Sequence, residues 1–212
     1  MAIVGEERNN ATSDISYFTG DSSPYGTTYG SWTTKWWQWI LSTPRSRNPI
    51  LDASGEYASI NQPFKSVWFL AGKLGNENRN LPNRFCAIPC GRSILFPVIN
   101  CEANPLEYPE LKTDQDIIEH VKRDEDSIIK KECYVDGRLI PAQRVKSDPI
   151  IFELNMVDHN LFTEKGGSTY GSADGYWVFI RPPPRGEHII SFQGECEYGR
   201  LCSGANYYVR IC

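Results

Sequence analysis

The segment YGSWTTKWWQWILSTP, residues 29–44, carries four of the six tryptophans in this 212-residue chain. The four indoles lie within eight positions and are Trp32, Trp36, Trp37 and Trp39. Ser31 is a suitable N-cap residue and Pro44 a suitable stop signal, so the segment predicts a helix over residues 31–43. One short element therefore holds a large share of the aromatic area of the molecule.

The apolar surface of this predicted helix is wide. At 100° per residue, the side chains of Trp32, Trp36, Trp39 and Ile40 span an arc of about 100°. Trp37 and Leu41 extend this arc to about 200°. A surface helix that covers a single core needs about half of that width. The helix is therefore either buried from two sides or keeps aromatic side chains for a partner.

Short strand patterns, separated by turn residues, dominate the rest of the chain. The predicted strands are residues 67–71, 84–88, 93–100, 133–135, 138–140, 150–155, 176–181, 188–193 and 206–212. A second helix is predicted over residues 113–131, where Thr113 caps the start. Ile117, Val121 and Ile128 form its narrow apolar stripe, which is typical of a surface helix lying on a sheet.

Turn residues complete this reading of the fold. Asp136 and Gly137 supply the positive φ angles of a type I′ hairpin. The Gly- and Ser-rich residues 164–175 predict a flexible loop. Many strands and only two helices predict a mainly β chain, with one antiparallel β-sandwich or jelly-roll-like domain over residues 25–212. The polar, aperiodic residues 1–24 predict an extended or disordered arm.

Composition and charge argue against several classes of function. The formal net charge is −4, and basic residues do not gather in runs longer than two, so the basic surface of a nucleic-acid-binding protein is missing. Apolar runs stay well short of the ~18 residues of a membrane-spanning helix. The N-terminus lacks the positive head and long apolar run of a signal peptide. We therefore expect no nucleic-acid partner and no transmembrane segment, in a chain that is either cytoplasmic or numbered from a mature start.

Seven cysteines bear on the choice of compartment. Cys86 and Cys90 bracket the turn-like AIP, and Cys196 and Cys202 bracket EYGRL. Such a density is typical of an oxidising compartment, so we favour disulfide bonds at these four positions and an extracellular or cell-surface location. Reduced thiols that act as small core hydrophobes are the alternative. Zinc is a third option, although neither spacing is that of a typical zinc knuckle. The odd count also permits a bond between chains.

Several phrases of the sequence together resemble a known group of proteins. They include YGTTYGSWTTKWWQWILSTP (25–44), VWFLAG (67–72), CAIPCGRSILFPVIN (86–100) and SADGYWVFI (172–180). These phrases resemble a family of uncharacterised prokaryotic proteins, many of them predicted to be exported. The resemblance extends from about Tyr25 to Gly194. It implies an exported protein, although this chain lacks a leader, and it implies no catalytic activity.

Two acids follow the predicted strand 93–100, in the segment CEANPLEYPE of residues 101–110. Glu102 and Glu107 at the end of a strand would suit a general acid/base pair, as in glycoside cleavage, or could join His188 at a metal. A solvated acidic loop is the simpler interpretation, and we favour it. We therefore expect no catalytic site, metal or cofactor, and keep these three residues as the candidates for one.

Aromatic residues are the better candidates for binding. The residues predicted to form an exposed stacking platform are Tyr29, Trp37, Tyr170 and Tyr176. Sugars, apolar ligands and protein partners all use such surfaces. Core packing explains Trp37 as well, because a wide apolar arc can be buried between two layers. We favour core packing for this residue.

Three hypotheses of function follow from these patterns. The preferred one is an exported β-sandwich protein that works by binding or as a structural component. It would self-associate as a homo-oligomer or surface polymer, or bind a surface glycan. An extracellular assembly would fall within this reading. The second hypothesis is a hydrolase or lyase that uses the Glu102/Glu107 pair. The third is a small-molecule carrier with a tryptophan-lined pocket.

Overall fold

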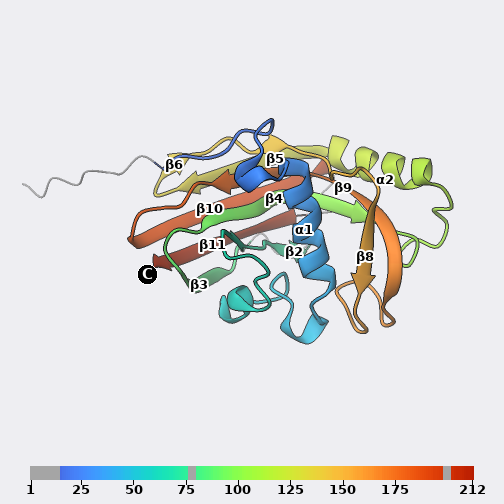
Figure 1. The fold of residues 1–212 in the computed structure, drawn as a ribbon, viewed down its shortest axis with the longest axis horizontal. Coiled ribbons are helices and arrows are strands. Elements are labelled where there is room, and N and C mark those ends of the chain that lie inside the picture. The colour runs from blue at the N-terminus through green and yellow to red at the C-terminus, as the bar shows by residue number, and fades with distance from the viewer. Residues whose placement is uncertain (1–14, 76–79, 198–201) are drawn as a thin grey trace, which may run out of the picture.

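Two β-sheets pack face to face, and helix α1 (Tyr29–Leu41) lies across the outer side of the first sheet (Figure 1). The computed structural model describes residues 15–75, 80–197 and 202–212. The first sheet has the strand order β1–β4–β9–β7, with β8 paired to another part of β9. The second sheet has the order β2–β11–β10–β5–β6, with β3 also paired to β11. This architecture confirms a mainly β domain with two α-helices.

The strands of each sheet have well-defined bounds. Those of the first sheet are β1 (Val67–Phe69), β4 (Ser93–Ala103), β7 (Gln143–Arg144), β8 (Phe152–Met156) and β9 (Gly167–Ile180). Those of the second sheet are β2 (Lys73–Gly75), β3 (Asn83–Ile88), β5 (Ile128–Val135), β6 (Arg138–Leu139), β10 (Gly186–Cys196) and β11 (Cys202–Ile211). Short 3-10 helices are η1 (Pro24–Gly26), η2 (Arg45–Arg47) and η3 (Glu56–Ser59). Both sheets are mixed and not purely antiparallel, because β1 runs parallel to β4, and β3 parallel to β11.

The main core lies between the two sheets. On the side of the first sheet it contains Trp68, Ile94, Phe96, Val178 and Ile180. On the side of the second sheet it contains Val135, Ile190, Phe192, Tyr207 and Val209. Because side chains alternate along a strand, the residues between these buried positions in β10 and β11 point away from the core. The second sheet therefore turns its other face to solvent.

Helix α1 is buried from two sides, which is one of the two arrangements that its wide apolar surface predicted. It starts two residues earlier than predicted, because the Thr28 hydroxyl caps it by accepting the Ser31 N–H at 3.1 Å. Trp36 donates its indole N–H to the Leu70 carbonyl at 2.8 Å, at the end of β1. Trp39 donates to the Ile60 carbonyl at 2.9 Å, in the segment between η3 and β1. All four clustered indoles are therefore core residues.

Helix α2 (Asp114–Asp126) lies at the end of the first sheet and packs on β4 and β9 (Figure 1). The predicted capping box is confirmed, with Thr113 and Asp116 exchanging hydrogen bonds. The predicted extension of this helix to residue 131 is wrong, because residues 128–135 form β5 and pair with β10. The β-branched Ile128 and Ile129 favour a strand over a helix at this point.

The predicted loop over residues 164–175 is also wrong, since β9 begins at Gly167 and pairs with β8 and β4. Its small residues serve close packing instead of flexibility. A Cβ on Gly171 would lie 2.6 Å from Glu102 Oε1 and 2.8 Å from the Ala103 carbonyl oxygen. A Cβ on Gly175 would lie 2.6 Å from the Trp177 indole nitrogen. Glycine here marks a crowded strand.

The predicted hairpin and the predicted arm had different outcomes. Asp136 and Gly137 have φ angles of 51° and 79°, which confirms the tight turn between β5 and β6. Residues 1–14 of the predicted arm lie outside the described residues. The part from residue 15 onward belongs to the domain, because Tyr17 bridges to Ile180 at the end of β9.

Candidate functional site

The end of β4 carries a buried polar cluster that joins the two acids predicted from the sequence. Glu102 is buried and lies against Gly171 of β9. The amide of Asn104 donates to the carboxylate oxygens of Glu102 at 3.1 and 3.4 Å. Its carbonyl oxygen Oδ1 accepts the backbone N–H groups of Leu106 and Glu107 at 2.9 and 3.1 Å. Asn104 therefore ties the loop that carries Glu107 to Glu102.

Both acids bind their protons more tightly than a solvated carboxylate. Burial raises the pKa of Glu102 well above its usual range, and the charge of Glu107 raises it further. Burial raises the pKa of Glu107 to about 7, against a hydrogen bond from Tyr108 that lowers it. A carboxyl with a pKa near 7 can exchange a proton at neutral pH, which general acid/base catalysis requires. Glu107 therefore has a proton affinity that suits acid/base catalysis, and burial shifts the pKa of Glu102 in the same direction.

A second carboxyl pair lies on the side of β4 that faces α2, and the sequence did not point to it. Glu125 of α2 and Asp174 of β9 are both buried. Arg144 of β7 donates to Asp174 Oδ2 at 2.8 and 3.0 Å and to Asp126 Oδ1 at 2.6 Å. Burial, and next the charge of Asp174, raise the pKa of Glu125 to about 9. The Cys101 thiol lies 3.6 Å from Glu125 Oε2. Glu125 is therefore a protonated, neutral acid beside the ion pair of Arg144 and Asp174.

His188 is engaged away from the two acids with which it was predicted to share a metal. Its Nδ1 lies 2.7 Å from Asp136 Oδ2 in the β5–β6 turn. Its Nε2 lies 3.0 Å from the carbonyl oxygen of Pro184 in the connection before β10. Both ring nitrogens thus help to hold turns of the second sheet. Across the part of the chain that the structure describes, no group of three His, Cys, Asp or Glu side chains is placed to hold a metal ion.

The aromatic residues predicted as an exposed platform do not form one surface. Tyr29 is 1% exposed and Trp37 is 4% exposed, so neither belongs to an exposed platform, and the core packing favoured for Trp37 is confirmed. Both side chains lie in the core, because α1 is covered on two sides. Tyr170 of β9 is exposed, and Tyr176 is half-buried with the ammonium of Lys131 4.3 Å from its ring centroid.

The cysteines do not form the predicted bridges. Among the described residues the structure contains no disulfide bond, and Cys86 and Cys90 are free thiols. Cys86 lies on β3, half covered, whereas Cys90 is exposed in the turn that follows. Cys196 ends β10 and Cys202 begins β11. The extracellular location, which rested in part on disulfide bonds, stays a prediction.

A row of large apolar side chains crosses the outer face of the second sheet. Its members are Phe85, Tyr208, Ile189, Tyr134 and Leu139, with exposures between 40% and 62%. They come from five adjacent strands, β3, β11, β10, β5 and β6. Tyr208 lies directly opposite both Phe85 and Ile189. Tyr134 lies directly opposite Leu139 and Ser191, so it meets Ile189 on the diagonal and the row shifts by two residues between β10 and β5. Five strands about 4.8 Å apart make this apolar row about 19 Å long.

Polar side chains border the apolar row on one side. Ser191 donates to Asn206 Oδ1 at 2.7 Å, and Asn206 donates to Asn83 Oδ1 at 3.1 Å. Farther along the same face, Lys130 donates to Gln193 at 3.0 Å and approaches Glu132 at 3.4 Å. On the other side of the row, Glu187 lies opposite Arg210. The face is thus an apolar strip flanked by hydrogen-bonding groups and by charges of both signs.

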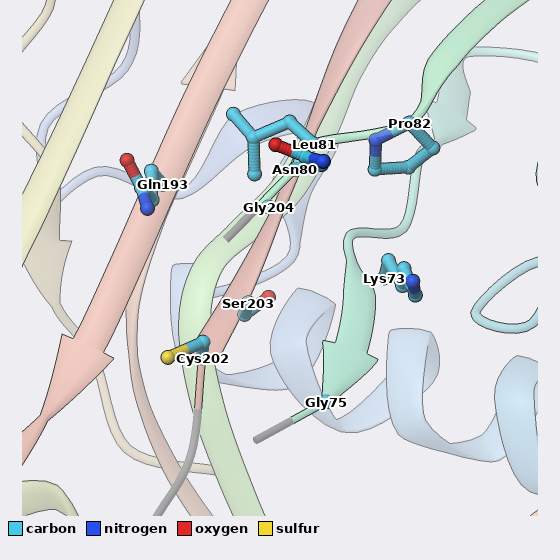
Figure 2. Close-up of a pocket in the computed structure, with 9 residues that line it drawn as sticks. All are labelled: Lys73, Gly75, Asn80, Leu81, Pro82, Gln193, Cys202, Ser203 and Gly204. Carbon is cyan, nitrogen blue, oxygen red and sulfur yellow. The ribbon is translucent and has the colours of Figure 1, made fainter. Parts of the chain in front are cut away.

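A small recess lies at the β2 end of the second sheet (Figure 2). Its lining comes from β2, β10, β11 and the residues before β3, and includes Lys73, Leu81, Gln193 and Ser203. The cavity volume is about 30 Å³, which is room for one or two water molecules. A ligand of substrate size does not fit there.

Comparisons with known proteins add nothing to this geometry. No family model, curated protein or solved structure matches the chain. Over the described ranges, the helices are all too short or too polar to span a bilayer. The resemblance to exported prokaryotic proteins stays a prediction, and any proposal of function rests on the molecule itself.

Proposed function

We propose that this chain is a binding protein that associates with a second copy of itself through the outer face of the second sheet. The observation that carries the proposal is the apolar row, in which five large side chains on five adjacent strands are each at least 40% exposed. Single exposed apolar residues are ordinary on protein surfaces, but a contiguous strip of them marks an interaction site. Partner binding, which the sequence suggested for the clustered tryptophans, is thus proposed for the outer face of the second sheet instead.

The composition of the apolar row favours a protein partner over a surface glycan. Two of its five members, Ile189 and Leu139, are aliphatic and offer no ring on which a sugar can stack. The rings of Phe85 and Tyr208 stack on each other, so each has one face already covered. Aliphatic and aromatic side chains packed together are typical of the core of a protein–protein interface.

The charges around the row suit a partner with the same surface. Glu187 and Arg210 lie opposite each other on one side, and Lys130 and Glu132 form a pair on the other. A two-fold dimer brings the same patch together from both subunits, so each charge must meet an opposite one. A face with both signs on either side of an apolar centre meets that condition, whereas a face of one sign repels its copy.

The proposal is tested by sedimentation equilibrium from micromolar to millimolar concentration. We expect the mass to rise from 24.1 kDa toward twice that value. Ile189→Thr should weaken the association about tenfold, since it removes a central apolar contact. Ile150→Thr is the matched control, because Ile150 is 47% exposed, against 49% for Ile189, and lies outside the row. A 24.1 kDa monomer at every concentration, or equal loss in both variants, would refute the proposal.

General acid/base catalysis by Glu102 and Glu107 is a second candidate function. The raised pKa of both carboxyls and their link through Asn104 support it. Groups whose pKa values are shifted by burial and by a neighbouring charge occur often at catalytic sites. A screen of glycosides and esters would identify a turnover, and Glu102→Gln should abolish it. Unchanged turnover in this variant would exclude Glu102 as a catalytic acid.

A further inference from the structure

The ends of three neighbouring strands bring two exposed cysteines together. Cys212 follows β11 and donates its backbone N–H to the Ile88 carbonyl at 3.0 Å. The Cys90 N–H donates to the Cys212 carbonyl oxygen at 2.8 Å, which continues the parallel β3–β11 ladder by one bond. In this ladder Cys212 lies opposite Pro89, and Cys90 lies one residue farther on, in the turn after β3. A strand spacing of about 4.8 Å and a rise of about 3.3 Å per residue place the two Cα atoms about 6 Å apart, and a disulfide joins Cα atoms about 4.4–6.8 Å apart. The backbone of these two residues is therefore within the reach of a disulfide bond.

Arg185 holds the sulfur of Cys90 toward the end of β11. This arginine directly precedes β10, whose first residue Gly186 lies opposite Ile211. It therefore flanks Cys212 on the β10 side of β11, while Cys90 flanks it on the β3 side. The guanidinium Nη2 donates to Cys90 Sγ at 3.0 Å, across that end of the strand. This contact holds the Cys90 sulfur, whereas the Cys212 thiol donates to the Arg210 carbonyl of its own strand at 3.8 Å, so the Cys212 side chain must rotate to reach Cys90.

Access distinguishes these two thiols from others in the described structure. Cys90 and Cys212 are both exposed, whereas Cys133 is buried. Burial raises the pKa of Cys133 to about 12, and burial with the charge of Asp52 does the same for Cys86. Thiol–disulfide exchange requires a thiolate that the reagent can reach. A small oxidant in solution therefore meets Cys90 and Cys212 first.

We propose that Cys90 and Cys212 form a redox modification site that reacts with low-molecular-weight disulfides such as glutathione disulfide. One protein thiolate attacks a sulfur of glutathione disulfide, forming a mixed disulfide and releasing one glutathione thiolate. The other protein thiolate then attacks the protein-bound sulfur and releases the second glutathione. Two protein thiols lose two electrons, glutathione disulfide gains them, and the two thiol protons pass to the two glutathione molecules. The bridge ties the end of β11 to the turn after β3, and it is independent of the self-association proposed above.

Peptide mapping of the full-length protein tests this site. The reduced protein is incubated with glutathione disulfide, blocked with N-ethylmaleimide and digested with trypsin without reduction. Cleavage after Arg84, Arg92 and Arg210 places Cys90 in residues 85–92 and Cys212 in residues 211–212. We expect these two peptides to be joined and lighter by two hydrogen atoms than their sum. Dithiothreitol should separate them.

Matched variants assign the bond to the proposed pair. Residues 85–92 also contain Cys86, so Cys86→Ser should keep the joined peptide and Cys90→Ser should lose it. Oxidation should raise the urea midpoint of the wild-type protein and leave that of Cys212→Ser unchanged. Three results would overturn the proposal: Cys90 and Cys212 that separately carry glutathione or maleimide, a bond formed by Cys86, or a bond that joins two chains on a non-reducing gel.

Discussion

Phe85 and Tyr208 stack across the parallel pair β3–β11, with ring centroids 4.9 Å apart and ring planes 15° from parallel, on the solvent side of the second sheet. The two rings are 62% and 40% exposed, so burial against the core does not account for their position. They form one end of the apolar row.

The stacked pair should contribute modestly to the stability of the monomer. Cross-strand aromatic pairs are worth about 0.5–1 kcal/mol beyond the separate residues. A double-mutant cycle of Phe85→Ala and Tyr208→Ala, measured by urea unfolding at micromolar concentration, should give a coupling free energy near the lower bound. Strictly additive losses would mean that the stack contributes nothing to the fold.

Two neighbouring indoles should differ in how much they stabilise the fold. Trp36 donates its N–H to the Leu70 carbonyl, whereas the Trp37 N–H is buried without a hydrogen-bond partner in the described structure. Trp36→Phe removes that bond and leaves the Leu70 carbonyl unpaired, at a cost of about 1–3 kcal/mol. Trp37→Phe loses ring volume only. Urea unfolding should therefore show the larger loss for Trp36→Phe, and the reverse order would contradict the assigned contacts.

Close packing at β9 predicts that an added methyl group is not tolerated there. In Gly171→Ala the new Cβ meets Glu102 Oε1, the Ala103 carbonyl and a Leu154 methyl group at 2.6–3.1 Å. Overpacking of this kind costs about 1–3 kcal/mol. Gly75→Ala is the control, because a Cβ at that position meets no atom within 4 Å. Equal thermal midpoints for the two variants would show that β9 is not packed as described.

The raised pKa of Glu125 predicts how the contribution of this residue to stability depends on pH. The folded state raises the pKa of this carboxyl from 4.5 to about 9, so the folded chain keeps a proton that the unfolded chain releases. The contribution of Glu125 to stability is then greatest below pH 4.5 and falls as the pH rises toward 9, with a loss of roughly 3 kcal/mol by pH 7.

Glu125→Gln removes the titrating group and keeps the shape of the side chain. Its free energy of unfolding should change less between pH 5 and pH 8 than that of the wild-type protein, as measured by urea unfolding at several pH values. Two parallel pH profiles would show that Glu125 titrates as a solvated acid.

The fold was predictable where local patterns were strong. The wide apolar arc of residues 31–43 predicted a helix near its true position, and Asp136-Gly137 predicted its hairpin. The first half of β9, residues 167–175, was missed, because its glycines fit closely against Glu102 and Asn100 of β4, which lie far away in sequence. Local composition cannot separate a flexible glycine from one that a distant residue requires.

The candidate sites depend even more on strand order. The sequence predicted a strand over residues 206–212, but not which strands would lie beside it. The apolar row exists only because β3, β11, β10, β5 and β6 are neighbours. The predicted Glu102 and Glu107 do lie together, because only four residues separate them and Asn104 joins the two by hydrogen bonds. Glu125 and Asp174 were missed because helix packing alone joins them.

Hydroxyl-radical footprinting at low and high protein concentration tests the proposed self-association most directly. Tyr208 of the apolar row and Tyr170 of β9 have nearly equal exposures, 40% and 39%. If two copies meet through the row, oxidation of Tyr208 must fall at high concentration while oxidation of Tyr170 stays constant. Equal oxidation of Tyr208 at both concentrations, or a parallel fall at both tyrosines, would contradict the account.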